Sequence, residues 1–190
     1  MNLRRYRRGE ATATLPIVFE DVDWAELAEA YYGHPDMQEL FAALASDDEN
    51  DIVVAEEELA SSIMVCSEVF ESTAAAVPLL LDLVSTARHR RASWLWLVGM
   101  CTDPEAAFGE RLPMVQAALT AHVDRVIGFL DDADSDVAAA TAYALVQCTD
   151  QPAARRALAE HPDQVLAAMK GPHEGFIDPV TDERLAEFIS

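Results

Sequence analysis

The chain has 190 residues, a length that suits one domain or one short repeat array. Hydrophobic residues make up 51% of it and only seven residues are glycine, a composition that excludes a disordered chain. Its formal net charge of −21 excludes a nucleic-acid-binding surface, because affinity for nucleic acid depends on basic side chains that neutralise phosphates. The same charge predicts that a protein partner would be basic.

The first 22 residues are predicted to form an arm or tail outside the folded body. They begin with the basic run RRYRR at residues 4–8, and no apolar segment of the secretory-signal type follows that run. No apolar stretch of the chain reaches the ~18 residues of a membrane-spanning helix. Three cysteines without CxxC spacing favour a reducing compartment, so we expect a cytoplasmic protein that does not act at a membrane.

Helical periodicity begins at Asp23. Residues 23–33 predict a first helix, with Asp23 as its N-cap and Gly33 as its stop. Residues 34–50 predict a second helix, because their apolar side chains recur at three- and four-residue spacing.

Residues 51–70 predict one long amphipathic helix. One side of this helix is an apolar stripe, and Glu57, Ser61 and Glu68 lie on the opposite side, facing solvent. The members of the stripe are Ile52, Ala55, Leu59, Ile63, Cys66 and Phe70.

The next two predicted helices, 73–87 and 89–101, are almost wholly apolar. Pro78 lies in the first of them, where it removes one backbone hydrogen bond and bends the helix. The second is apolar on every side after Arg91, which predicts that neighbouring helices cover it all round.

The remaining chain predicts five more helices and a C-terminal segment, and no long alternation typical of strands interrupts it. The five helices are expected at 112–119, 123–130, 136–148, 151–160 and 162–169. Residues 171–190 contain two Gly and two Pro, which predicts a loop followed by a short terminal helix. The prediction is therefore an all-α fold with its folded body at residues 23–170.

Two almost identical stretches, CTDPEAA from Cys101 and CTDQPAA from Cys148, lie 47 residues apart. The same shift places Trp96 on Tyr143. Shifts of 85 and 35 residues align SDDENDIVVA with DDADSDVAAA and VPLLLDLV with LPMVQAAL. A recurring unit of helix, acidic turn and second helix predicts an α-solenoid, in which helix pairs stack because one pair alone cannot bury both faces.

The acidic turns have a local explanation. Asp51 and Asp136 are expected to N-cap the second helix of their pair, and nearby carboxylates favour the positive end of its dipole. The turn DDADSD lacks the glycine and the distant glutamate of a calcium-binding loop, so no metal is expected there.

The stretch FLDDADSDVAAATAYAL resembles the HEAT-repeat consensus, which has Leu, Asp in the turn, Asp-Val opening the second helix, small residues and Leu. Residues 23–150 as a whole resemble small HEAT-repeat proteins of actinobacteria. The resemblance implies a solenoid of HEAT-like helix pairs, a fold used mainly for binding other macromolecules. Ala138 and Val53 stand where HEAT repeats often carry arginine, so the usual ladder of Asp–Arg pairs is not expected.

The sequence shows no catalytic constellation. Some HEAT-like hydroxylases hold a di-iron site with several His-Glu pairs, whereas this chain has one such pair, His173-Glu174. No histidine lies near a Cys or Asp at the spacing of a metal site or a catalytic triad. Cys101 and Cys148 are expected to be buried apolar residues rather than nucleophiles. We therefore expect no catalytic residue, no cofactor and no metal.

These observations favour a non-catalytic protein-binding scaffold or adaptor. Its candidate binding surface consists of Glu57, Ser61, Met64 and Glu68, with Trp96 and Tyr143 as aromatic anchors. Trp94 and Trp96 lie two residues apart and cannot share a helix face, so one of them is expected in the core. The other is expected either to pack on the neighbouring repeat or to be exposed as a binding anchor.

Two alternatives remain open from the sequence. Small size and strong acidity also suit an immunity or inhibitor protein that neutralises a basic toxin. A small-ligand binder or an enzyme without a recognisable site is the second alternative. The sequence does not set the oligomeric state.

Overall fold

The computed structural model describes residues 22–27, 36–172 and 179–189. This part of the chain contains ten α-helices, one short 3-10 helix at Trp24–Glu26 and one two-stranded hairpin, so the predicted all-α class is confirmed. The predicted arm up to residue 21, most of the predicted helix 23–33 and residues 173–178 of the predicted C-terminal loop lie outside the described residues.

The helices follow one another at short intervals along the chain. Their bounds are α1 Met37–Leu44, α2 Glu49–Ile63, α3 Glu71–Thr86, α4 Arg91–Thr102, α5 Leu112–Thr120, α6 Val123–Ile127, α7 Ser135–Val146, α8 Pro152–Glu160, α9 Pro162–Lys170 and α10 Pro179–Ala186. The hairpin strands are β1 Met64–Val65 and β2 Glu68–Val69.

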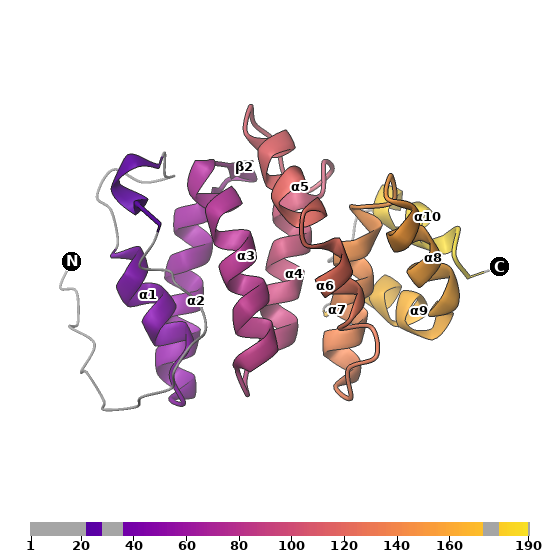
Figure 1. Cartoon of the computed structure of the whole chain (residues 1–190), viewed down its shortest axis with the longest axis horizontal. Coiled ribbons are helices and arrows are strands. Elements are labelled where there is room, and N and C mark those ends of the chain that lie inside the picture. Colours follow the sequence, from indigo (N-terminus) through magenta and orange to yellow (C-terminus); the bar gives the residue numbers. More distant parts are fainter. Residues whose placement is uncertain (1–21, 28–35, 173–178, 190) are drawn as a thin grey trace.

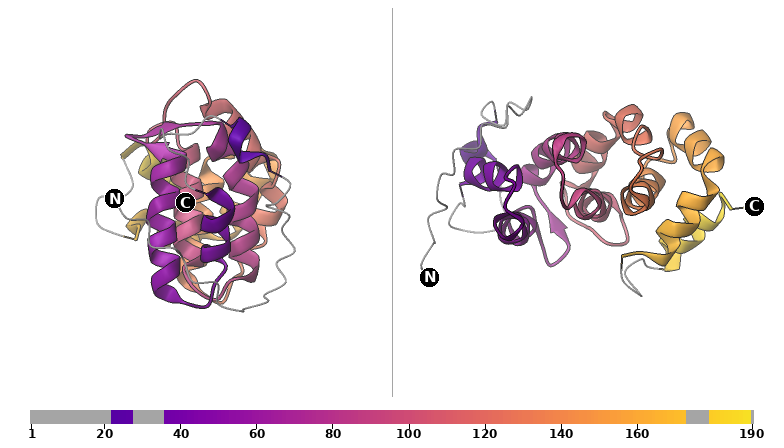
Figure 2. Two further views of the ribbon diagram at one scale, coloured as in Figure 1. Left: turned by 90° about the vertical axis from the view of Figure 1, so that its left-hand side faces the viewer. Right: turned by 90° about the horizontal axis from the view of Figure 1, so that it is seen from below.

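The helices lie side by side in a row that follows the sequence, with α1 at one end and α8, α9 and α10 at the other (Figure 1). Seen from below, several of them are viewed nearly end-on, which shows that they run close to parallel or antiparallel (Figure 2). Helix α1 packs on α2 and α3 on α4, while α3 also packs on α5, and α7 packs on both α4 and α9. The row therefore consists of helix pairs whose members contact the next pair.

Helix α4 is covered on all sides, as predicted from its uniformly apolar sequence. Trp94, Leu95, Trp96, Leu97 and Val98 are all buried. Both tryptophans are in the core, and Trp96 packs on Tyr143 of α7 rather than being exposed as an anchor. Helix α7 is enclosed in the same way, since each of its residues from 137 to 146 is buried. Helix α4, with its two tryptophans, and the Ala-rich helix α7 form the centre of the molecule.

The N-caps differ from the predicted ones by two or three residues. Asp48 caps α2 by accepting a hydrogen bond from the backbone N–H of Asn50 at 2.9 Å, and Asp134 caps α7 through Asp136 N–H at 3.0 Å. Asp51 and Asp136 lie inside the first turns instead, where their charges favour the helix dipole. The acidic turns therefore have the expected capping role, but earlier carboxylates perform it.

The predicted helix over residues 51–70 is wrong in its last third. Helix α2 ends at Ile63, and the chain then forms the hairpin, in which Met64 pairs with Val69 and Val65 with Glu68. Its two turn residues, Cys66 and Ser67, have φ values of 50° and 69°, which is the left-handed region that two-residue hairpin turns require. Cys66 is consequently exposed and is not part of the apolar stripe.

Helix α3 tolerates Pro78 well inside it. The helix begins at Glu71, so the proline is in its third turn and leaves the carbonyl group four residues earlier without its usual N–H donor. The start of α3 is fixed by Thr73, whose hydroxyl accepts from the N–H of Phe70 at 2.8 Å and donates to the carbonyl of Ile63 at the end of α2. Thr73 thereby ties α2 to α3 across the hairpin.

Candidate protein-interaction surface

Two of the predicted surface residues lie on the solvent-facing side of α2. Glu57 and Ser61 are exposed, and the Ser61 hydroxyl donates to the backbone carbonyl of Glu57 at 2.8 Å. Val54, one turn before Glu57, is 52% exposed, which is unusual for a large apolar side chain in a helix. Spacing of three and four residues puts Val54, Glu57 and Ser61 in one line along the helix. We call these three residues the α2 stripe.

The other two predicted residues of the α2 face lie in the hairpin rather than on the helix. Glu68 is exposed in β2, where its strand forms a bridge to Phe108, a residue 55% exposed. Met64 is only half exposed, and its sulfur lies 4.0 Å from the Cys101 sulfur. The four predicted residues thus do not form one continuous helical face.

Trp96 and Tyr143 are not exposed anchors, and that prediction is wrong. Their relative exposures are 7% and 2%, and their ring centroids are 4.8 Å apart with a tilt of 38°. The two residues occupy equivalent positions in the repeat and pack on each other because α4 and α7 are neighbours. Aromatic pairs in this geometry stabilise a core.

The part of the row from α1 to α3 is strongly acidic. Residues 36–87 contain 12 Asp and Glu but no Lys or Arg. Arginines from later in the chain neutralise three of them, through the pairs Arg90–Glu56, Arg111–Glu71 and Arg125–Asp82. Within the described residues the other carboxylates of α1, α2 and the hairpin have no basic partner. They are Asp36, Glu39, Asp47, Asp48, Glu49, Asp51, Glu57, Glu58 and Glu68.

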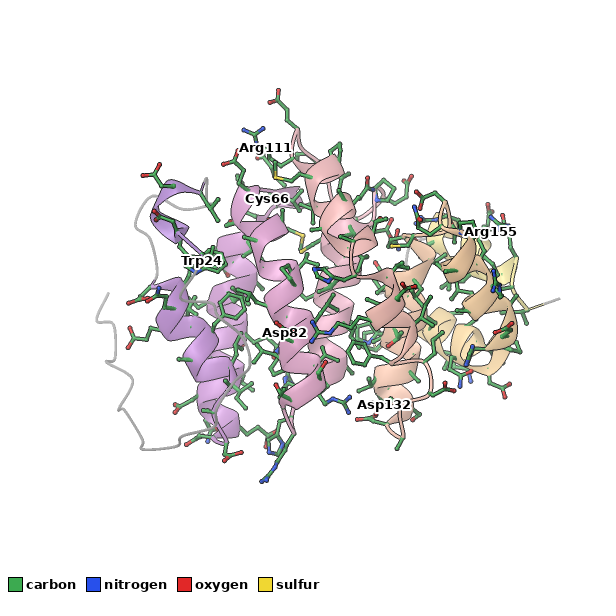
Figure 3. The ribbon with its side chains drawn as sticks, in the orientation of Figure 1. Trp24, Cys66, Asp82, Arg111, Asp132 and Arg155 are labelled. Carbon is green, nitrogen blue, oxygen red and sulfur yellow. The ribbon has the colours of Figure 1, made fainter. Side chains whose placement is uncertain are left out.

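A set of arginine–carboxylate pairs links neighbouring helix pairs, although the ladder typical of HEAT repeats was not expected. The guanidinium of Arg91 at the start of α4 donates to both carboxylate oxygens of Asp132, at 3.1 and 2.5 Å. This hydrogen bonding holds the pKa of Asp132 below its ordinary value. Asp82 on α3 and Asp132 before α7 mark two successive links along the row (Figure 3). Sequence reasoning missed these pairs because it looked for arginine only directly after the first turns of α2 and α7, at Val53 and Ala138, whereas the arginines lie in or beside α4, α5 and α6.

The most highly connected polar group is the buried carboxylate of Asp103, which follows α4 in the CTD stretch. Its exposure is 0%, and it accepts hydrogen bonds from Tyr143 Oη at 3.2 Å, Thr181 Oγ1 at 2.7 Å and Arg184 Nη2 at 2.8 Å. Gln147 Nε2 and the backbone N–H of Glu105 complete the set, at 3.3 and 3.1 Å. The equivalent Asp150 in the second CTD stretch is exposed. One repeated aspartate is thus a buried junction and the other a surface residue.

The thiols of Cys101 and Cys148 are buried, as predicted. Burial raises the pKa of Cys101 to about 12 and that of Cys148 to about 11. Thiols of this kind stay protonated near neutral pH and are poor nucleophiles. Among the described residues no group of three His, Cys, Asp or Glu side chains is placed to hold a metal ion.

The chain matches no protein-family model, no curated protein and no solved structure. None of the described helices combines the length and the apolar character needed to cross a lipid bilayer.

Proposed function

We propose that the chain is a non-catalytic α-solenoid of the HEAT type that binds another protein. The observation that carries this proposal is the contact between repeat-related helices. Helices α4 and α7, related by the 47-residue shift, pack side by side, as do α3 and α5, related by the 35-residue shift. Adjacent equivalent helices are what stacking of one repeated unit produces.

The partner in this proposal is a basic protein, and its contact lies at the α2 stripe. Nine carboxylates of α1, α2, the turns before them and the hairpin have no basic partner among the described residues, and Val54 adds an exposed apolar side chain on α2. Opposite charges steer a partner toward such a surface, while the apolar contact contributes to holding it. Three free thiols fit the reducing cytoplasm in which we place the protein.

The unpaired charge also favours the narrower role of an immunity or inhibitor protein for a basic toxin. Both roles use the same surface, so they are separated by the identity of the partner rather than by the geometry. A toxin gene beside this gene would favour the inhibitor role, because such pairs must be expressed together.

The test is affinity capture from the native organism at low and high salt, with charge variants of the bait. Glu57→Gln/Glu58→Gln, which removes two carboxylates of α2, should lose a partner that the unaltered chain retains at low salt. The matched control is Glu160→Gln/Asp163→Asn, which removes two exposed carboxylates at the far end of the row. Equal loss of the partner in both double variants would contradict a contact at α2, and no basic partner from any bait would contradict the proposal.

A further inference from the structure

The C-terminal helix α10 fills a polar site that the rest of the molecule presents. It packs against α7 and α9, and its own residues Thr181 and Leu185 are fully buried in that contact. Two side chains of α10 reach Asp103: Thr181, which is 78 residues away in sequence, and Arg184, which is 81 residues away. Helix α10 is thus a distant segment inserted into a site formed by the ends of α4 and α7.

The acceptor atoms of that site match a guanidinium group. Arg184 Nη2 donates to Asp103 Oδ1 at 2.8 Å, and Arg184 Nη1 donates to Gln147 Oε1 at 3.1 Å. Two acceptors on different helices therefore receive the two terminal nitrogens of one planar group. This is the geometry that distinguishes arginine from lysine as a ligand.

Among the residues that the structure describes, Arg184 is the one cation that bonds to Asp103. The other donors are the neutral groups of Tyr143, Gln147 and Thr181 and one backbone N–H. A carboxylate with no solvent exposure is strongly destabilising unless a positive charge compensates it. Without Arg184, the ends of α4 and α7 would present a preorganised anionic site.

The docking of α10 is imperfect in two respects. Asp182 Oδ1 and Arg184 Nε are buried, and neither has a hydrogen-bond partner within the described part of the chain. Each such group adds an unfavourable desolvation term to the docked state. The helix has only eight residues, and helices this short are not stable by themselves in water. Its folding and its docking are therefore one coupled step that a competing ligand can oppose.

We propose that Asp103 and Gln147 form a guanidinium-binding site, which Arg184 of the same chain occupies. Helix α10, which carries Arg184, then competes for this site with an arginine of the basic partner. The part concerning the partner rests on the proposed function, whereas the binding site itself does not. An arginine side chain from the partner would displace Arg184 and α10 together. The site would then contribute specificity for arginine over lysine that the exposed α2 stripe lacks.

The first test is chemical rescue of the full chain carrying Arg184→Ala. Removing the guanidinium should lower Tm, and millimolar ethylguanidinium should raise the Tm of this variant by about 2–4 °C. Methylammonium at equal ionic strength should give no such rise, because it lacks the planar fork. Neither the unaltered chain nor the double variant Asp103→Asn/Arg184→Ala should respond to ethylguanidinium. Equal responses to the two cations, or no response, would overturn the site.

A second measurement covers the case in which Arg184→Ala does not fold. Leu185→Ala weakens the docking of α10 while leaving Asp103, Gln147 and Arg184 in place. The peptide acetyl-Gly-Arg-Gly-amide should bind this variant at least about tenfold more tightly than the unaltered chain, because the cis competitor is weakened. The same peptide with lysine should show no such gain. Equal affinities of the arginine peptide for both chains would overturn the competition.

These tests separate the two proposals. Both use small probes in place of the partner, so a positive rescue with no captured partner contradicts the proposed function alone. A captured basic partner together with a failed rescue contradicts the guanidinium site alone.

Discussion

Gly99 permits the closest approach between the two central helices. A Cβ atom at this position would lie 2.5 and 2.6 Å from the Cδ1 and Cε1 atoms of Tyr143. The ring cannot move aside easily, because it stacks on Trp96 and its hydroxyl donates to buried Asp103. The contact between α4 and α7 therefore depends on the absence of a side chain at one residue.

We predict that Gly99→Ala destabilises the protein by about 1–3 kcal/mol, the usual effect of overpacking a core. The gain in helix propensity of Ala over Gly, about 1 kcal/mol, offsets only part of the clash. Urea unfolding followed by circular dichroism measures the change. Gly128→Ala is the matched control, since its added Cβ would approach nothing closer than 3.3 Å. A Gly99→Ala protein as stable as the control would contradict this packing.

The exposure of single residues could not be predicted from the sequence. The 47-residue shift correctly made Trp96 and Tyr143 equivalent, but equivalence says nothing about exposure. Their burial depends on the packing of α4 against α7, and Tyr143 also contacts the carboxylate that α10 covers. Periodicity detects which residues share a helix face, but it does not show which other segment covers that face.

Between elements, Arg91 and Asp132 form a bidentate salt bridge. Both side chains are mostly shielded, at 22% and 17% exposure, and the guanidinium also donates to the carbonyl of Val84 at 2.6 Å. Arg91 therefore joins the end of α3, the start of α4 and the turn before α7. By contrast, Arg155 and Glu187 are 3.9 Å apart and more than half exposed.

We predict that Arg91→Gln lowers the free energy of unfolding by about 1–3 kcal/mol at pH 7, because a charge-assisted, bidentate pair is lost. The folded-state pKa of Asp132 is lowered, so the pair stabilises the fold above the unfolded value of 3.8. That contribution disappears as the pH falls through the folded value. The difference between variant and unaltered chain, measured by urea unfolding from pH 7 to pH 3, should therefore shrink below about pH 4.

The control for this series is Arg155→Gln, which removes an exposed pair and should cost less than about 1 kcal/mol at any pH. A constant difference for Arg91→Gln across the pH range would show that lost packing of the arginine stem, and not the ion pair, explains its effect.

The positions of most helices followed from periodicity, but the hairpin did not. Residues 64–69 continue the apolar spacing of α2, and the turn is formed by Cys66 and Ser67 rather than by the Asn-Gly or Gly-rich pairs that mark such turns. Its stability comes from outside the segment: Val69 N–H donates to Phe108 O at 3.0 Å, and Phe108 N–H donates to Ser67 O at 2.8 Å. A contact with a loop forty residues away is invisible to local patterns.

At the scale of the whole molecule, charge is distributed unevenly along the row of helices. The nine Lys and Arg of residues 88–190 share that part with 16 Asp and Glu, while residues 9–87 have 18 Asp and Glu and no basic residue. The carboxylates of α1 and α2 therefore repel one another with little compensation inside the fold. Like charges at such density oppose the compact state, and dissolved salt reduces that repulsion.

We predict that Tm rises as NaCl is increased from 0.01 to 1 M, over which the Debye length falls from about 30 to about 3 Å. Salt also weakens the arginine–carboxylate pairs, but the pair of Arg91 and Asp132 is partly shielded from solvent. Its interaction energy therefore changes less with salt than the repulsion between exposed carboxylates does. Differential scanning calorimetry measures the slope. Glu57→Gln/Glu58→Gln should flatten it more than Glu160→Gln/Asp163→Asn, because the first change removes charge where no cation offsets it. A Tm that falls with salt would mean that the ion pairs outweigh the repulsion, and it would contradict this prediction.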